Sequence, residues 1–281
     1  MSLPPQLKKT DTSFWDERRG IIRTEKGGWV IGEAVYNHGY SMMDDLVGTA
    51  SFFQVLLLNA TGRLPERRLA DWLEALFICL SWPDARIWCN QISSLAGTMR
   101  TSPVAGVSAG ILASDSRMYG PGVAVAGSEF IIAGLRNKLD GITAEQIVAG
   151  YPKRRADGTP VIPGFVRPIA SGDERVEAME KVATDLQFAN GDHLALAYEI
   201  EEVMINKYNE GMNLLGYAAA FLCDQKFSAF EISCILSTWV HSGTHACFAE
   251  ATQNPPESFF PLHCSDIDYR GKEARAVPPR Q

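Results

Sequence analysis

The chain lacks several features that would assign it to a common class of protein. Its 281 residues contain no C-x-x-C pair, no H-E-x-x-H motif, no Walker loop and no dinucleotide-binding glycine fingerprint. No apolar run approaches the roughly 20 residues that cross a bilayer. The pair Arg18-Arg19 is not followed by the apolar core of an export signal. We therefore expect a cytoplasmic protein that has no membrane partner and no metal site.

Positive charge is also scarce. There are 26 Lys and Arg residues against 33 Asp and Glu residues, a net charge of −7, which argues against a nucleic acid as the main partner. The cysteines are dispersed, as expected for reduced, mostly buried residues rather than a disulfide framework. They are Cys79, Cys89, Cys223, Cys234, Cys247 and Cys264. A hydrophobic content of 46% fits a globular chain with a sizeable core.

The pattern of apolar residues predicts helices along most of the chain. Strand alternation is weak beyond Val35, so we expect at most one short extended pair, within residues 29–36. Stretches 49–58, 68–80, 176–186 and 194–204 are amphipathic or strongly apolar. Capping boxes begin at Thr143 and Ser228, and the second predicts a helix that continues to Gly243. The expected fold class is all-α, with a small N-terminal β-hairpin.

One long segment, residues 150–175, interrupts the helical pattern. It is rich in Gly, Pro, Lys and Arg, and a loop of this length inside a compact helical protein is usually functional. Its positive charges in an acidic chain suggest an anionic ligand, and a solvated basic turn is an equally good interpretation.

This segment resembles the ligand loop of the citrate synthase and citryl-CoA lyase family. Val161–Phe165 resembles the family's "I-P-G-F-G-H" loop, and Asp173–Arg175 resembles its "D-P-R". Other motifs follow in the family's order over residues 35 to 275. They are Gly39–Gly48 for "G-Y-x-h-x-D-L-h-G" (h apolar), Gly62–Pro65 for "G-x-L-P", Gly120–Ala126 for "G-P-L-H-G-G-A", Asn213–Tyr217 for "N-V-D-G", Gly243–Glu250 for the "G-x-x-A-H" helix and Tyr269–Gly271 for "Y-x-G".

The resemblance implies an architecture and a ligand. It implies a citrate synthase-like homodimer with a large helical domain, residues 1–137 and 229–281, and a small domain, residues 138–228, that carries the ligand loop. It also implies coenzyme A or an acyl-CoA as a substrate. The loop residues Val161, Ile162, Pro163, Gly164 and Phe165 would hold the adenine of CoA through main-chain groups. Lys153, Arg154 and Arg155 are candidate partners of its phosphates.

The chain departs from the family at the positions that carry the chemistry. Family members remove a proton next to a thioester with a carboxylate, while neutral hydrogen-bond donors hold the enolate oxygen. The expected histidines fall on Val123 and Arg167, and the expected aspartate falls on Leu215. Two further family positions fall on Pro83 and Thr238. Valine and leucine neither donate a hydrogen bond nor accept a proton, so the usual route has no base.

Several polar residues are candidates for a changed site. Arg175 either matches the carboxylate-binding arginine of "D-P-R" or is a surface arginine that pairs with Asp173 or Glu177. Arg167 brings a permanent cation that binds an anion or caps a helix. Asp84 and His38 are candidate replacement groups, and Glu210 is a further candidate base. His241 and His245 are spaced four apart, which suits either a metal or a packed pair, and no third ligand is apparent.

Two functions remain open. The first is an enzyme, a lyase or acyltransferase, with altered chemistry on a CoA thioester or another carboxylated small molecule. The second is a pseudoenzyme that keeps the fold and acts as a dimeric binding or regulatory module.

Overall fold

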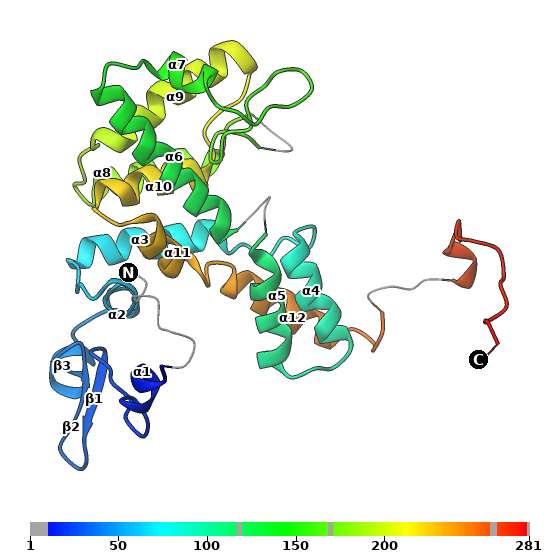
Figure 1. Ribbon diagram of the computed structural model, residues 1–281, viewed down its shortest axis with the longest axis horizontal. Helices are drawn as coiled ribbons and strands as arrows, with labels where there is room; N and C mark the ends of the chain where they lie inside the picture. Colours follow the sequence, from blue (N-terminus) through cyan, green and yellow to red (C-terminus); the bar gives the residue numbers. More distant parts are fainter. Residues whose placement is uncertain (1–10, 117–119, 168–170, 259–262, 280–281) are drawn as a thin grey trace. The chain divides into compact units, whose positions relative to one another are not determined.

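The computed structural model describes residues 11–116, 120–167, 171–258 and 263–279 (Figure 1). The chain divides into two compact units, residues 1–74 and 75–281. Among the described residues, no helix is long and apolar enough to cross a membrane. The structure is mostly helical with one small sheet, which confirms the predicted fold class.

The N-terminal unit contains the sheet. Strands β1 (Gly27–Val30), β2 (Ala34–Asn37) and β3 (Tyr40–Ser41) are antiparallel in the order β1-β2-β3. Trp29 pairs with Val35, so the predicted short extended pair is confirmed. A short helix, α1 (Ser13–Asp16), precedes it, and a helical turn, Met42–Leu46, follows it.

Helix α2 (Phe52–Thr61) begins and ends where its sequence signals are. Ser51 and Gln54 form a capping box at its start. Gly62 ends it with φ +78°, a left-handed conformation that glycine adopts without strain. The next helix, α3 (Arg67–Leu80), buries Trp72, Leu73 and Leu76 completely, as its apolar spacing predicts.

Three helices of the second unit pack through small residues. We call α4 (Trp88–Thr98), α5 (Pro103–Ser114) and α12 (His241–Gln253) the three-helix layer (Figure 1). A Cβ built on Gly110 of α5 would lie 2.2 Å from the Ser93 hydroxyl and 2.8 Å from a methyl group of Thr244. The helices therefore approach each other at a distance that only glycine permits at this position.

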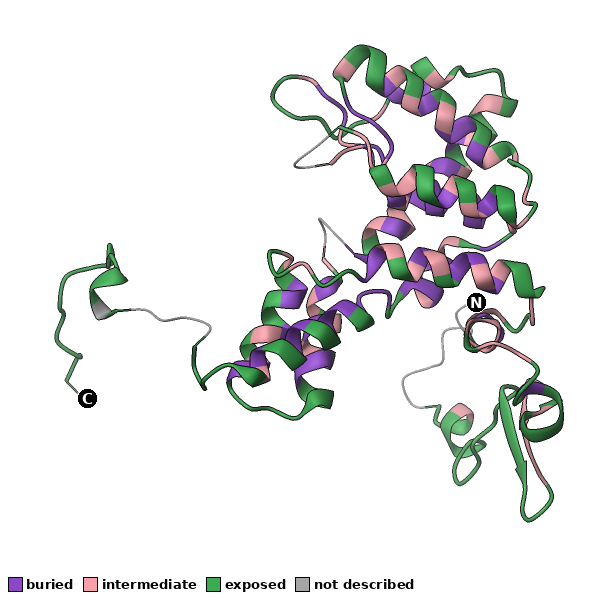
Figure 2. Cartoon of the chain, turned by 180° about the vertical axis from the view of Figure 1, so that it is seen from behind, coloured by how far each residue is buried: buried purple, intermediate pink, exposed green. Residues whose placement is uncertain are grey.

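The remaining helices bury a larger apolar core. Helix α6 contacts α7, α9, α10 and α11, and α10 is buried over nearly its whole length (Figure 2). The bounds are α6 (Pro121–Leu139), α7 (Ala144–Ala149), α8 (Glu174–Asp185), α9 (Asp192–Tyr208), α10 (Leu214–Asp224) and α11 (Ala229–Leu236). Both predicted capping boxes, at Thr143 and Ser228, are present.

One helix prediction is wrong. The helix that begins after Ser228 ends at Leu236 instead of continuing to Gly243, and α12 begins at His241. Ser237 donates its hydroxyl proton to the Cys234 carbonyl, and Trp239 N–H bonds to the Leu236 carbonyl. Such local bonds compete with the helical ladder. The predicted division into domains 1–137 with 229–281 and 138–228 stays a prediction.

Candidate functional site

The basic residues of the loop are used to hold the loop itself. Residues 153–161 form a turn in which Val161 N–H donates to the Lys153 carbonyl at 2.8 Å. The Arg154 guanidinium donates to the carbonyls of Gly158 and Val148 at 2.8 and 3.2 Å. Arg155 forms an ion pair with Glu210, whose side chain is 10% exposed. Arg154 and Arg155 are therefore already committed to contacts within the protein.

The segment Val161–Phe165 lies against the first turn of α10. Ile162 and Phe165 are buried, and Gly164 has φ +90°. A Cβ on Gly164 would lie 2.5 Å from the Cα of Gly216, so two glycine backbones touch. The Gly164 carbonyl also accepts a hydrogen bond from Asn213 N–H at 2.8 Å. These contacts fix the loop on the helix without any side chain between them.

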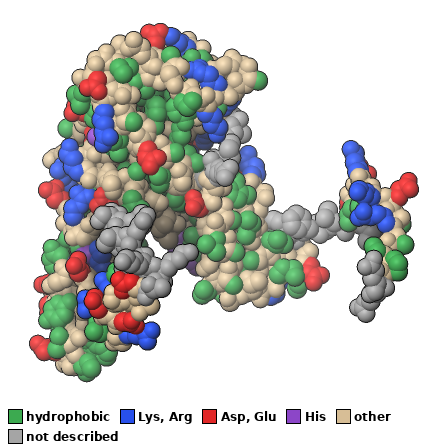
Figure 3. Space-filling model, in the orientation of Figure 1, with side chains coloured by type: hydrophobic (Ala, Val, Ile, Leu, Met, Phe, Trp, Pro, Cys, Tyr) green, Lys and Arg blue, Asp and Glu red, His purple; other side chains and the backbone are tan. Residues whose placement is uncertain are grey.

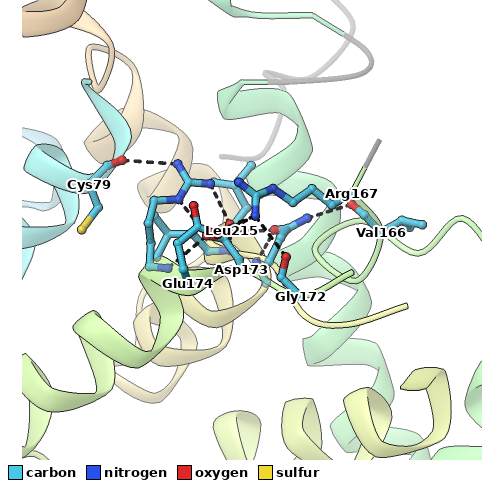
Figure 4. A network of polar contacts seen from close by, with 11 residues as sticks. Cys79, Val166, Arg167, Gly172, Asp173, Glu174 and Leu215 are labelled. Carbon is cyan, nitrogen blue, oxygen red and sulfur yellow. Dashed lines mark hydrogen bonds and ion pairs between the residues drawn. The ribbon is translucent and has the colours of Figure 1, made fainter. Parts of the chain in front are cut away.

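Asp173 connects the loop, α8 and α10 (Figure 4). Its carboxylate is fully buried and accepts bonds from Arg175 Nε at 2.8 Å, Arg175 Nη2 at 2.6 Å and Leu214 N–H at 3.1 Å. Burial opposes ionisation of this carboxyl, but the hydrogen bonds from Arg175 and Leu214 outweigh it and lower the pKa of Asp173. Asp173 is therefore a buried anion.

Arg175, the predicted carboxylate-binding arginine, already holds a carboxylate. Its guanidinium bonds both oxygens of Asp173, the bidentate arrangement that an external carboxylate would otherwise take. Its Nη1 donates to the Cys79 carbonyl at 3.3 Å. A ligand carboxylate would have to compete with Asp173 for this side chain.

Arg167 lies in the same network with more of its guanidinium available. Its Nη1 donates to the Gly172 carbonyl at 3.1 Å and to Glu174 at 2.9 Å, and lies 3.8 Å from Asp173. The side chain is 16% exposed. Its Nε and Nη2 make no hydrogen bond within the part of the chain that the structure describes. The bond from Arg167 is the main cause that lowers the pKa of Glu174.

Leu215 lies at the start of α10 and is linked through Asn213 to Val166, the residue before Arg167 (Figure 4). Leu215 N–H donates to the Asn213 side chain at 2.9 Å, and that side chain donates to the Val166 carbonyl at 3.0 Å. The N-terminal turn of α10 is thus tied to the residue that precedes Arg167.

Val123 lies on α6 near the same loop. A Cβ on Gly127 would lie 3.5 Å from the Pro163 carbonyl oxygen and 3.8 Å from Ala219, so the loop, α6 and α10 meet there. Val123 precedes Gly127 by one helical turn, and Leu215 precedes Ala219 by one turn. The structure therefore places two apolar side chains at the α6 and α10 ends nearest this contact.

The other two candidates are Asp84 and His38. The Asp84 carboxylate bonds Arg86 Nη2 at 2.6 Å, and this hydrogen bond is the main cause that lowers the pKa of Asp84 to about 2. No contact among the described residues joins Asp84 to Arg167 or Arg175. His38 belongs to the N-terminal unit, where its Nε2 is buried and has no hydrogen-bond partner among the described residues.

Comparison with solved structures gives the class of the fold: citrate synthase-like. The neighbours include a citryl-CoA lyase from Hydrogenobacter thermophilus, with a TM-score of 0.78 at 25% identity over 92% of this chain and 98% of the other. The ATP citrate lyase from Methanothrix soehngenii, in complex with citrate and coenzyme A, has a TM-score of 0.73 at 18% identity. This chain is 97% covered in that match but spans only 46% of the lyase.

A citrate synthase from the archaeon Thermoplasma acidophilum, bound to carboxymethyl coenzyme A and oxaloacetate, shares the fold at a TM-score of 0.59 and 15% identity, over 82% of this chain and 60% of the other. No family model and no curated protein sequence matches the chain. The predicted resemblance is confirmed: the structural neighbours are citryl-CoA lyase and citrate synthase-like proteins.

Sequence reasoning allowed a surface pair between Arg175 and Asp173, but it missed that Asp173 is buried and also binds the first turn of α10. The signal was present, because an aspartate two residues before an arginine at a helix start is able to cap the helix and bind the arginine together. The resemblance directed attention to the arginine instead. It also missed the pairing of Glu210 with Arg155, which joins residues far apart in the sequence.

Proposed function

We propose that this chain binds a CoA thioester or a related carboxylated molecule on the citrate synthase-like scaffold, and acts on it as a lyase or acyltransferase with altered chemistry. The observation that carries the proposal is Arg167. This mostly buried guanidinium is tied to the loop at Gly172 and to α8 at Glu174, and its Nε and Nη2 make no hydrogen bond within the described residues. Those two groups form one edge of the fork that binds a carboxylate or phosphate.

Arg167 supplies charge but cannot supply a base, because a guanidinium stays protonated in proteins. It would bind the ligand anion or the oxygen on which negative charge develops. The candidate carboxylates are themselves paired: Glu210 with Arg155 and Asp84 with Arg86. A carboxylate of pKa about 2 is a weak base, so Asp84 is the poorer candidate. His38, the remaining candidate from the sequence, belongs to the N-terminal unit.

The partners follow from the scaffold. The loop Val161–Phe165 would take the adenine of CoA through its main chain, and Lys153, which forms no side-chain hydrogen bond among the described residues, would take a phosphate. The ATP citrate lyase that shares this fold is in complex with coenzyme A and citrate. We place the protein in the cytoplasm.

A homodimer would cover the exposed apolar surface of the three-helix layer. Val104 and Leu112 on α5 are each 77% exposed, and Met99 is 56% exposed. Figure 3 shows hydrophobic side chains at the surface of this part of the molecule. Such side chains on adjoining helices suit an interface between two copies.

Ligand-induced stabilisation tests the binding step. The unfolding temperature of the wild type, of Arg167→Gln and of Arg136→Gln would be measured with CoA, acetyl-CoA and citrate. Arg136 is an exposed arginine on α6 outside the site and serves as the matched control. A ligand at a hundred times its Kd stabilises the fold by about 2.7 kcal/mol. We expect a CoA species to shift the wild type and Arg136→Gln, and Arg167→Gln to bind at least about tenfold more weakly. No shift of the wild type would refute binding.

One observation favours a pseudoenzyme as the second candidate. Arg175 is saturated by the buried Asp173, and the described site has apolar side chains at Val123 and Leu215. Two assays on the same protein sample distinguish the two candidates. Formation of acetyl-CoA and oxaloacetate from citryl-CoA reports lyase turnover, and release of free CoA thiol from acetyl-CoA supplied with oxaloacetate and water reports acyl transfer. Binding with turnover supports the enzyme. Binding without turnover supports a binding module.

A further inference from the structure

Two histidines outside the proposed site lie side by side on the outer face of α12. The opposite face of this helix is buried: Gly243, Thr244, Cys247 and Phe248 pack in the three-helix layer. His241 and His245 are four residues apart and both exposed, so their side chains project from adjacent turns of the free face.

The two imidazoles are close enough to share one ion. Their Nε2 atoms are 3.1 Å apart, and the rings meet edge to face with centroids 4.5 Å apart. Two nitrogens bound to one metal at about 2.0–2.1 Å each are separated by about 2.9 Å at a right angle and about 3.4 Å at a tetrahedral angle. The observed separation falls between these values. Small ring rotations, which exposed side chains make freely, would aim both lone pairs at a common point.

We propose that His241 and His245 form a two-histidine chelating site for a divalent transition-metal ion, such as Zn²⁺, Ni²⁺ or Cu²⁺. Among the described residues no group of three or more His, Cys, Asp or Glu side chains could hold a metal. The protein therefore supplies two nitrogen ligands, and water fills the other positions. Imidazole ligands select these ions over Mg²⁺ and Ca²⁺, which prefer oxygen.

Burial and the neighbouring His245 lower the pKa of His241. A metal ion binds imidazole through the lone pair of a ring nitrogen. The hydrogen bond between the rings in the metal-free protein keeps them together, so chelation needs little reorganisation.

Titration calorimetry with NiCl2 on the full chain tests the site. The variants are His241→Ala and His245→Ala, with His263→Ala as the control, because His263 is an exposed histidine outside the helix. We expect one Ni²⁺ per wild-type chain and the same affinity in His263→Ala. Each α12 variant should bind at least about tenfold more weakly, since chelation by linked ligands gains a factor of this order or more.

Comparing the affinities of different metal ions tests whether nitrogen ligands form the site. Cu²⁺ should bind more tightly than Ni²⁺ or Zn²⁺, and Mg²⁺ should not bind. Retained affinity in both α12 variants would overturn the proposal, as would loss in only one of them, since a chelate needs both nitrogens. A wild type that takes up no Ni²⁺ at 100-fold higher concentration than protein would overturn it as well. Circular dichroism would confirm that the variants, altered at exposed positions, remain folded.

Discussion

The three-helix layer and the network around Asp173 are held together by different forces. In the layer, α4, α5 and α12 meet backbone to backbone at glycines, and the contacts are van der Waals packing with few charges. Around Asp173, a buried carboxylate collects donors from Arg175 and from the first turn of α10. The helices of the layer can approach each other because glycine has no side chain at the contacts. The network is held by hydrogen bonds and ion pairs that converge on the Asp173 carboxylate.

This difference shows which motif positions can change while the fold is kept. Gly164 and Gly216 keep the family's glycines, because their backbones touch and any Cβ would collide. The motif resemblance predicts histidine, histidine and aspartate at the positions of Val123, Arg167 and Leu215, and none of these three residues has a positive φ. The glycine contacts that hold the loop on α10 do not depend on these three side chains.

The largest expected effect is that of Asp173→Asn. The change leaves Arg175 without its carboxylate partner in a mostly buried position, and breaking a buried pair is strongly destabilising. We expect a loss of about 3 kcal/mol in the free energy of unfolding, measured by urea denaturation, after allowing for the 24% exposure of Arg175. Glu174→Gln, at an exposed acid in the same network, should cost less than about 0.5 kcal/mol. Equal losses in the two variants would show that the network has no single centre.

Acid unfolding adds an independent readout of the same variant. The pKa of Asp173 is lowered in the folded state, so its stabilisation is present above the unfolded pKa of about 3.9 and is lost as the pH falls through the folded value. As the pH falls below about 4, the free energy of unfolding of Asp173→Asn should therefore decrease less than that of the wild type.

The next effect is expected in the three-helix layer, from Gly110→Ala. The added Cβ would lie 2.2 Å from the Ser93 hydroxyl oxygen and 2.8 Å from the Cys89 carbonyl oxygen, so α4 and α5 would have to separate. Overpacking of this kind costs about 2 kcal/mol. Ser108→Ala, on the exposed face of the same helix, is the matched control and should change the unfolding midpoint little. A tolerated Gly110→Ala would mean that the layer is looser than its glycines indicate.

The sequence predicted the fold better than the site, and the residues show why. The capping boxes at Thr143 and Ser228, and the glycine stop at Gly62, depend only on neighbours in sequence, and all three are present. The layer helices α4 and α5 were not delimited, because most of their buried positions are small or polar residues and give little hydrophobic periodicity.

The site could be predicted only in part. Motif order named Arg167 and Leu215 as site positions, and Asn213 links the turn that contains Leu215 to Val166, the residue before Arg167. Pairings such as Asp173 with Leu214 N–H, or Arg155 with Glu210, join segments about 40 to 55 residues apart and leave no local pattern. The sequence offered the pair of Arg175 with Asp173 only as a surface contact, and its burial became visible in three dimensions.

The smallest effect on stability is expected from Asp84→Asn. This variant tests an ion pair that belongs neither to the three-helix layer nor to the network around Asp173. Asp84 bonds Arg86, whose side chain is 82% exposed, and solvent screens such a pair. The unfolding midpoint should stay the same within error. The pKa of Asp84 should nevertheless be about 2 in an NMR titration, because Arg86 bonds its carboxylate. In Arg86→Gln it should return toward its ordinary value of about 3.9. If turnover of a CoA ester disappears in Asp84→Asn while stability and binding persist, Asp84 is the missing base. Unchanged turnover excludes Asp84, the result expected of a carboxylate whose low pKa makes it a poor proton acceptor.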